Sequence, residues 1–209
     1  MKKAIVTIGR QFGSGGRQIG KRLAELLNIP YYDRELITEA ARKSGVSEEY
    51  FQKIDETAAS SLLYTLSAGS YMMGTQMASI NDLPANDRLY VIQSEIIREK
   101  AAQGPCVLVG RCADYILRDH PERISVFIHA GDTFRLKRIV EEYGADPKKA
   151  PDIMRRTDKK RAQYYHYYTD GKWSDAANYQ LTFDSSLTGI EGGAALICSF
   201  IEHAHPLSK

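Results

Sequence analysis

The sequence predicts an α/β fold built around a parallel sheet, and three observations support that prediction. Short apolar runs rich in β-branched residues, which are typical of buried parallel strands, recur along the 209-residue chain. Segments with helical apolar spacing alternate with these runs, as in sheets whose parallel strands are joined by helices. Glycines crowd the turn between the first run and the first helix, residues 9–16, and glycine lets backbone amides approach a ligand closely. The sequence therefore predicts a candidate binding turn as well as a fold class.

The opening strand, turn and helix begin the first βαβ unit. We expect a mostly apolar strand at residues 4–8 that ends at Gly9. The helix after the turn carries one apolar stripe at spacings i, i+4, i+7 and i+8, formed by Ile19, Leu23, Leu26 and Leu27. Asn28 and Pro30 end this helix, and the tyrosine pair at residues 31–32 suits a second strand.

The remainder of the chain continues the alternation, apart from two segments. We expect strands at residues 106–110, 124–128 and 179–184, and sheet-packing helices over residues 89–97, 136–143 and 190–201. The segment from residue 38 to about 88 is rich in small and turn-forming residues, and we interpret it as a helical insertion. The segment 146–168 is rich in cations and tyrosines, which predicts a solvated helix with a charged face.

Length and composition limit the organisation of the chain. With 43% hydrophobic content, 209 residues can bury one substantial core, so we interpret residues 1–209 as a single domain. The formal net charge is only +2, so any binding of phosphate or nucleic acid must depend on local clusters of charge. The three cysteines lack CxxC spacing, and no apolar stretch reaches the length of a membrane span, which together favour a cytoplasmic protein.

The glycine-rich turn lies between a strand and a helix, as a phosphate-binding loop does, but it lacks the residues usual in such a loop. Such a loop reads GxxxxGK[ST] between a strand and a helix, and its amides, lysine and hydroxyl serve the phosphates and Mg²⁺. If Gly16 is the last glycine of the loop, Arg17 replaces the lysine and Gln18 replaces the hydroxyl. Cations at the start of a helix are mildly destabilising without an anion, which favours phosphate binding over a purely structural turn. The candidate phosphate-binding residues are Gly9, Arg10, Gln11, Gly13, Ser14, Gly15, Gly16, Arg17 and Gln18.

Six segments resemble a known family. IGRQFGSGG, IPYYDREL, VLVGRCADYIL, ISVFIHAGDTFRLKRI, DKKRAQYYHYY and LTFDSS follow one another in that order over almost the full chain. They resemble the cytidylate kinase-like proteins, relatives of the bacterial cytidylate kinases in the nucleoside monophosphate kinase group. The resemblance implies a three-layer P-loop kinase fold with a five-stranded parallel sheet, an NMP-binding insertion at about residues 38–88 and a lid at about residues 146–172. It also implies ATP and Mg²⁺ as cofactors, and phosphoryl transfer to a nucleoside monophosphate or a similar small acceptor.

The same resemblance assigns roles to residues that bind the acceptor. Asp33 and Arg34, in YYDREL, are expected to bind the substrate. Arg111, in VGRCAD, is expected to clamp the acceptor phosphate, with a structural ion pair as the alternative. Asp114, two residues after the motif's Cys112, either serves the site or pairs with Arg118 one helical turn later.

Catalytic roles fall mainly on the lid segment. Arginines there neutralise the transferring phosphoryl group in the family, and Asp158 and Arg161 match the lid spacing best. The full set of catalytic candidates is Arg17, Arg111, Arg156, Asp158 and Arg161. A solvated charged face remains the alternative for the lid residues, and core or interface packing for the tyrosines that follow them.

Replacements at family positions leave a second function open. Arg17, Gln18, Val109 and His129 stand where the family usually has other residues. They favour, as the alternative, a non-catalytic nucleotide-binding or sensing protein with a degenerate P-loop. The Mg²⁺ ligand is equally open, since Gln18 offers only an amide oxygen and Ser14 or water could replace it.

The expected partners are small nucleotides. The five histidines lack the paired spacing of a zinc site, so we predict no metal site built from protein ligands alone. The near-zero net charge and a single short basic run argue against nucleic acid, and no membrane partner is predicted. The tyrosine-rich stretch leaves a homodimer open.

Overall fold

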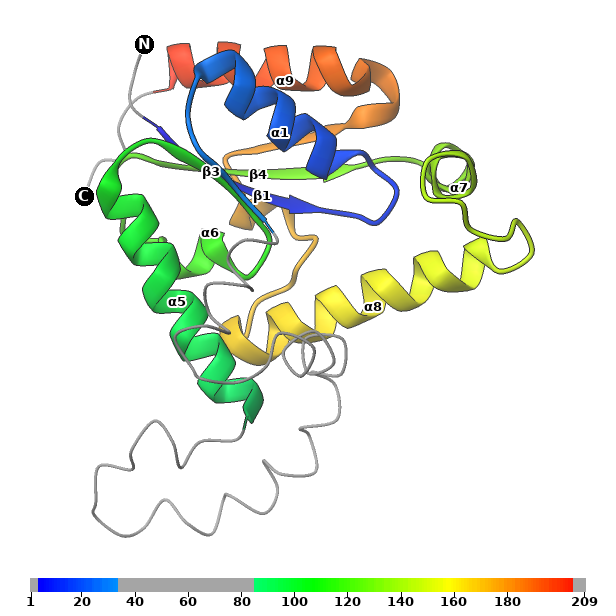
Figure 1. Ribbon diagram of the computed structural model, residues 1–209, viewed down its shortest axis with the longest axis horizontal. Coiled ribbons are helices and arrows are strands. Elements are labelled where there is room, and N and C mark those ends of the chain that lie inside the picture. Colours follow the sequence, from blue (N-terminus) through cyan, green and yellow to red (C-terminus); the bar gives the residue numbers. More distant parts are fainter. Residues whose placement is uncertain (1–3, 34–84, 205–209) are drawn as a thin grey trace, which may run out of the picture.

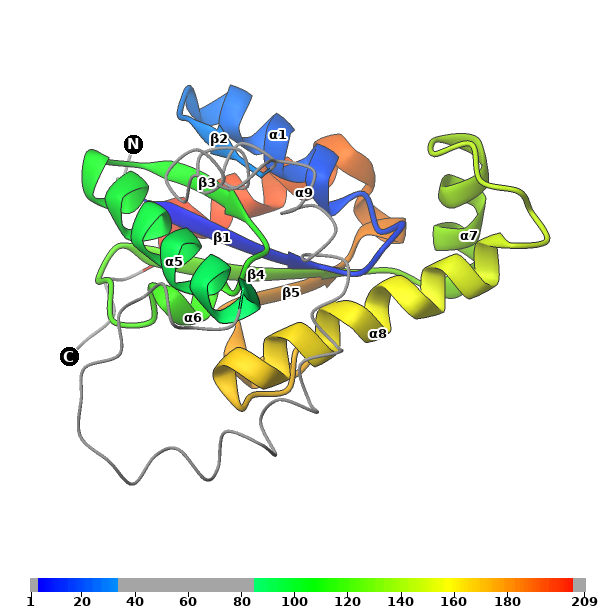
Figure 2. The same cartoon turned by 60° about the horizontal axis from the view of Figure 1, so that its bottom comes forward.

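A five-stranded parallel sheet lies at the centre of the molecule. The computed structural model describes residues 4–33 and 85–204, drawn in colour in Figures 1 and 2. The strands are β1 (Ile5–Arg10), β2 (Tyr31–Tyr32), β3 (Cys106–Val109), β4 (Arg123–His129) and β5 (Leu181–Asp184). Their order in the sheet is β2-β3-β1-β4-β5, and all neighbours are parallel. The carboxyl end of the central strand β1 therefore emerges between those of β3 and β4.

Helices α1 (Gly16–Leu27) and α9 (Ser185–His203) cover one face of the sheet (Figure 1). Successive strand residues point to opposite faces, so alternate residues of β1, β3 and β4 meet these helices. Val6, Ile8, Val107, Val109, Val126 and Ile128 pack here against Ile19 and Leu23 of α1 and Ala194, Ile197 and Ile201 of α9. This packing fixes the start of α1 directly beyond the end of β1.

Helices α5 (Ala85–Gln103) and α6 (Ala113–Ile116) cover the opposite face. Ile5, Cys106 and Leu108 point to this side and pack against an apolar stripe of α5. The members of that stripe are Leu89, Ile92, Ile96, Ile97 and Ala101. The two faces together make the three-layer arrangement that the family resemblance implied.

Helices α7 (Asp132–Glu141) and α8 (Ala150–Thr169) form a smaller unit beside the sheet. Ile139, Ala150 and Met154 form its core, with Phe12 from the turn after β1 packed against it. In both views α8 runs past the end of the sheet at which β1 and β4 finish (Figures 1 and 2). The 3₁₀ helix η3 (Ala176–Asn178) then leads into β5.

The α/β class and the strand order along the chain are confirmed, while several details differ. The first strand continues to Arg10, two residues beyond the predicted end, because it pairs with β4 as far as Ile128. The closing helix begins at Ser185, with a kink at Gly189 (φ 64°), and not at residue 190. The short elements α6 and η3 were not predicted, since neither is long enough to show apolar periodicity.

Two residues expected on buried stripes are exposed. Leu26 is 43% exposed, and Ala24 of the same helix is buried in its place. Tyr143 is 44% exposed and lies beyond the end of α7. The predicted insertion falls on residues 38–84, which lie outside the described residues, while residues 85–88 belong to α5.

Within the described ranges, no helix combines the length and the apolar character needed to cross a membrane.

Candidate active site

The turn between β1 and α1 is shaped by glycines in the left-handed region. Gly13 and Gly15 have φ angles of 81° and 80°, and α1 begins at Gly16. Among the residues that the structure describes, the backbone amides of Gly13, Gly15 and Gly16 have no hydrogen-bond acceptor. Free amides at the start of a helix, where the helix dipole is positive, are suited to an anion.

Buried contacts hold this turn in place. The Ser14 hydroxyl donates to the Gln11 carbonyl at 2.9 Å, and the Ser185 hydroxyl donates to the Ser14 carbonyl at 2.6 Å. Ser14 is fully buried, so its hydroxyl serves the turn itself. The side-chain oxygen of Gln11 accepts from the amide of Ala130 at 3.1 Å. The polar side chains of Ser14 and Gln11 are therefore used in building the turn.

Replacing Gly13 by alanine is expected to lower the free energy of unfolding by roughly 1 to 3 kcal/mol. The residue has a positive φ, and an added Cβ would lie 2.8 Å from the Arg135 carbonyl oxygen. Urea denaturation measures the effect. Gly131→Ala is the matched control because Gly131 has a φ of −62° and nothing lies within 4 Å of a Cβ there. Equal stability of the two variants would contradict the prediction.

Arg17 pairs with Asp33 at the end of β2. The Arg17 Nε lies 2.5 Å from Oδ2 of Asp33, and the Arg17 side chain is half exposed. The Tyr31 hydroxyl lies 3.4 Å from Oδ2 of Asp33, on the strand that carries the aspartate. Burial raises the pKa of Tyr31 to about 12, so the phenol keeps its proton at neutral pH. Arg17 is thus directed toward the end of β2.

Gln18 is also occupied by the protein. Its side-chain oxygen accepts from Arg138 of α7, and its amide nitrogen donates to Glu142 at 3.2 Å. This exposed network links the first turn of α1 to the end of α7.

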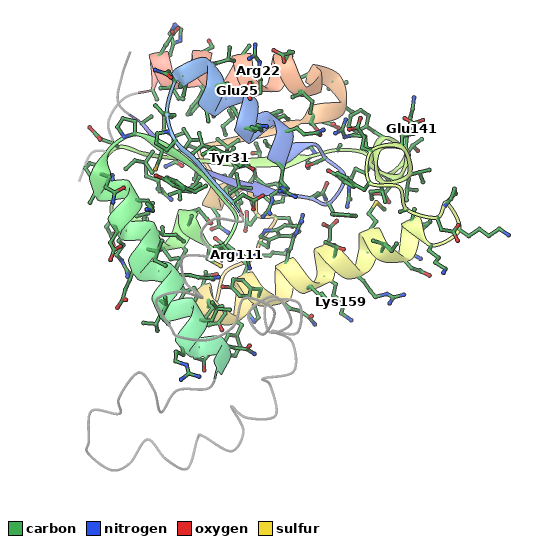
Figure 3. All side chains as sticks on the ribbon, in the orientation of Figure 1. Arg22, Glu25, Tyr31, Arg111, Glu141 and Lys159 are labelled. Atoms are coloured by element: carbon green, nitrogen blue, oxygen red, sulfur yellow. The ribbon has the colours of Figure 1, made fainter. Side chains whose placement is uncertain are left out.

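A cavity of about 440 Å³ opens where the carboxyl ends of β1 and β3 face α8. Four cationic side chains line it: Arg10, Arg111, Lys160 and Arg161. Its aromatic wall consists of Tyr164, Tyr165, Trp173 and Tyr179. Figure 3 shows Arg111 between the sheet and α8. The cavity thus has the chemistry to hold an anion next to an aromatic group.

The guanidinium groups of this cavity are held where charge is costly. Burial lowers the pKa of Arg10 and of Arg111, and it lowers the pKa of Arg161 to about 9. The positive charge of Arg10 lowers the pKa of Arg161 further, because the two cations repel each other. Asp33, 3.9 Å from Arg10, offsets part of this repulsion. A bound anion would offset more of it.

Asp114 is a buried carboxyl group at the cavity. The Tyr165 hydroxyl donates to its Oδ2 at 2.7 Å, and burial raises the pKa of Asp114 despite that hydrogen bond. The alternative pairing with Arg118 is wrong. Arg118 instead lies 3.7 Å from Asp119 and packs over the Tyr115 ring.

Comparison with known proteins decides the family. A family model described as the cytidylate kinase-like family matches residues 5–187. The chain belongs to the cytidylate kinase-like family. A search of curated proteins finds no match to it.

Solved structures support the fold of this cytidylate kinase-like protein. An uncharacterized protein from Eubacterium ventriosum matches with a TM-score of 0.71 and 29% identity, over 96% of this chain and 99% of the other. Shikimate kinase from Bacteroides thetaiotaomicron matches with a TM-score of 0.55 and 13% identity, over 96% and 99% of the two chains. Shikimate kinase from Acinetobacter baumannii, solved in complex with shikimate, matches with a TM-score of 0.50 and 15% identity, over 96% and 93%. The fold is therefore that of the kinases.

The cytidylate kinase-like chain brings some of its predicted site residues together and separates others. Gly9, Arg10, Arg111 and Arg161 line the cavity. Arg156 is exposed and, with Asp158, is not among the described residues that line it. Arg34 lies outside the described residues.

Asp158 ties α8, which lies in the segment predicted to be a lid, to the glycine turn. Its Oδ1 accepts from the Phe12 amide at 2.8 Å, and its Oδ2 pairs with Arg135 of α7. The Arg135 Nε donates to the Phe12 carbonyl at 2.7 Å, and Arg135 is only 4% exposed. We therefore interpret Asp158 as a residue that positions the lid.

The sequence did not predict several residues that line the cavity or hold the glycine turn in place. Trp173 and Tyr179 reach the cavity from the segment before β5, and Lys160 reaches it from α8. Arg135 had one available signal, since it precedes the buried Ile139 by four residues, about one helical turn, and so stands on the inner side of α7.

Proposed function

We propose that this protein transfers a phosphoryl group from ATP, with Mg²⁺, to a nucleoside monophosphate or a similar small anionic acceptor. The observation that carries the proposal is the cavity, which places four cationic side chains at the carboxyl ends of β1 and β3. Phosphoryl transfer needs mainly positioning and neutralisation of negative charge, and such a cavity supplies both. Membership of the cytidylate kinase-like family supports the same reaction class.

The cavity suits a nucleotide acceptor better than a bare anion. Its aromatic wall is fixed, because the Tyr179 hydroxyl donates to the Trp173 carbonyl at 2.7 Å and Trp173 packs edge-on against Phe127 at 5.2 Å. Flat aromatic side chains stack on nucleobases, while arginines bind phosphate oxygens through paired N–H groups. Together these groups suit a molecule with a base at one end and a phosphate at the other.

The glycine turn fits the polyphosphate of the donor. The free amides of Gly13, Gly15 and Gly16 and the buried guanidinium of Arg10 would hold its oxygens. Bound Mg²⁺ would supply further neutralisation of the phosphate charge. Since the Ser14 hydroxyl is occupied, and the described residues hold no cluster of metal-ligating side chains, phosphate oxygens and water would be its ligands.

Arg111→Gln tests the proposal. With ATP and Mg²⁺ and a panel of nucleoside monophosphates, we expect ADP formation from one or more acceptors. We expect the variant to lose about 10- to 100-fold in kcat/KM, the worth of a charge-assisted hydrogen bond. Arg118→Gln, an exposed arginine outside the cavity, is the matched control.

The second candidate is a nucleotide sensor that binds without turnover. Arg17 and Gln18 stand at the positions where a P-loop usually has a lysine and a hydroxyl residue. They favour the sensor, because both side chains are paired with other groups of the protein. Saturable ATP binding with no ADP formed across the panel would support the sensor and contradict the kinase. Absence of nucleotide binding would contradict both.

A further inference from the structure

The strand that ends at Arg10 fixes this residue on both sides. Its backbone pairs in register with Ile128 of β4. Its carbonyl accepts from Nη1 of Arg161 at 2.9 Å, which ties it to the lid helix α8. Arg10 is therefore held at the centre of the carboxyl end of the sheet, between the glycine turn and the lid.

Two glycines provide the space that the Arg10 side chain fills. A Cβ on Gly16 would lie 2.5 Å from the Arg10 Cβ, and a Cβ on Gly110 would overlap Nη1 of Arg10. Gly16 is the first residue of α1, and Gly110 directly precedes the acceptor-clamp candidate Arg111. The guanidinium thus lies between the start of α1 and the turn after β3.

The Arg10 guanidinium is short of partners at that point. Its Nε is buried, and it has no hydrogen-bond partner in the described part of the chain. The carboxylate of Asp33 lies 3.9 Å from Nη2, but that carboxylate is engaged at 2.5 Å by Arg17. Burial lowers the pKa of Arg10, because the guanidinium loses contact with water there, and Asp33 offsets only part of this effect. A buried donor without an acceptor is expensive unless a ligand completes it.

We propose that Arg10, and not Arg17, is the P-loop cation of this protein, and that its guanidinium binds the transferring phosphoryl group between the glycine turn and Arg111. The inference rests on the proposed function and adds to it the residue that replaces the usual lysine. Arg17 is half exposed and is paired with Asp33 beside the end of β2, so we assign it only a supporting role. A guanidinium binds two phosphate oxygens through a planar, fixed fork of N–H donors, whereas a lysine ammonium acts as a compact point charge.

Equilibrium binding of inorganic tripolyphosphate and of ATP, measured by calorimetry, tests the inference without requiring turnover. We expect Arg10→Gln to weaken binding of both ligands by about 10- to 100-fold. Arg17→Gln should weaken it several times less, and Arg118→Gln is the matched surface control. Circular dichroism and a thermal melt check the fold of each variant.

Two conservative variants, Arg10→Lys and Arg17→Lys, keep the test decisive if Arg10→Gln does not fold. Arg10→Lys retains the stem and the charge but loses the fork, so we expect a loss of binding larger than that of Arg17→Lys. The inference is overturned if the Arg17 variants lose more affinity than the Arg10 variants. If the wild-type protein binds neither tripolyphosphate nor ATP, the proposed function itself fails; if it binds both and Arg10→Gln binds equally well, only the inference fails.

Discussion

Substitution of Arg161 by glutamine is expected to reduce kcat/KM for phosphoryl transfer by about 10²- to 10³-fold. Arg161 brings the lid charge into the cavity, where its Nη1 donates to the Arg10 carbonyl at 2.9 Å and its guanidinium lies 5.6 Å from the centre of the Phe12 ring. Inside a partly enclosed cavity a positive charge stabilises the negative charge of the transferring group more strongly than in open water. The expected loss is therefore mainly in kcat.

The matched control for Arg161→Gln is Lys159→Gln. Lys159 is a cation on the same helix, two residues earlier, and its side chain is exposed to solvent (Figure 3). The Lys159→Gln variant should retain the wild-type kcat/KM within about twofold, because an isolated surface charge contributes little to catalysis. Arg161→Lys should fall between the two, since lysine keeps the charge without the fork. Retention of wild-type kcat/KM by Arg161→Gln would show that the lid charge has no catalytic part.

The central sheet could be predicted because its strands carry their own signal. Each run is almost wholly apolar and ends at a residue that breaks the pattern, as β3 does before Gly110. The stripe on α1 was predicted less well. Periodicity alone does not show that the helix turns Ala24 inward, against the sheet and α9, and leaves Leu26 exposed.

Two groups of cavity residues could be predicted: those at the ends of strands, from the strand pattern, and Arg161 of α8, from the family resemblance. Arg10 is the last residue of β1 and Arg111 follows the end of β3 by two residues, and parallel strands bring such ends together. The partner of Arg17 could not be predicted, because Asp33 reaches it through the return of the chain along β2. Trp173 and Tyr179 likewise reach the cavity only through the path of the chain between α8 and β5.

The ion pair between Arg135 and Asp158 links α7 to α8 beside the glycine turn, and Arg135→Met is expected to lower the free energy of unfolding by about 3 to 5 kcal/mol. Arg135 is 4% exposed and contacts Asp158 and the Phe12 carbonyl through separate N–H groups. Its removal leaves Oδ2 of the part-buried Asp158 and the carbonyl oxygen of Phe12 without the Arg135 donor, which costs more than the pair itself contributes.

A double-mutant cycle separates the cost of leaving Asp158 without Arg135 from the interaction free energy of the Arg135–Asp158 pair. Asp158→Leu in the Arg135→Met background removes the stranded carboxylate, so the double variant should recover part of the lost stability, as measured by urea denaturation. Each variant should also show faster amide exchange at Phe12, whose N–H donates to Asp158. If the two single losses simply add, Asp158 and Arg135 act independently and the lid is held by the apolar contacts of Ile139 and Met154. A positive coupling would instead show that the Arg135–Asp158 pair itself stabilises the contact between α8 and the glycine turn.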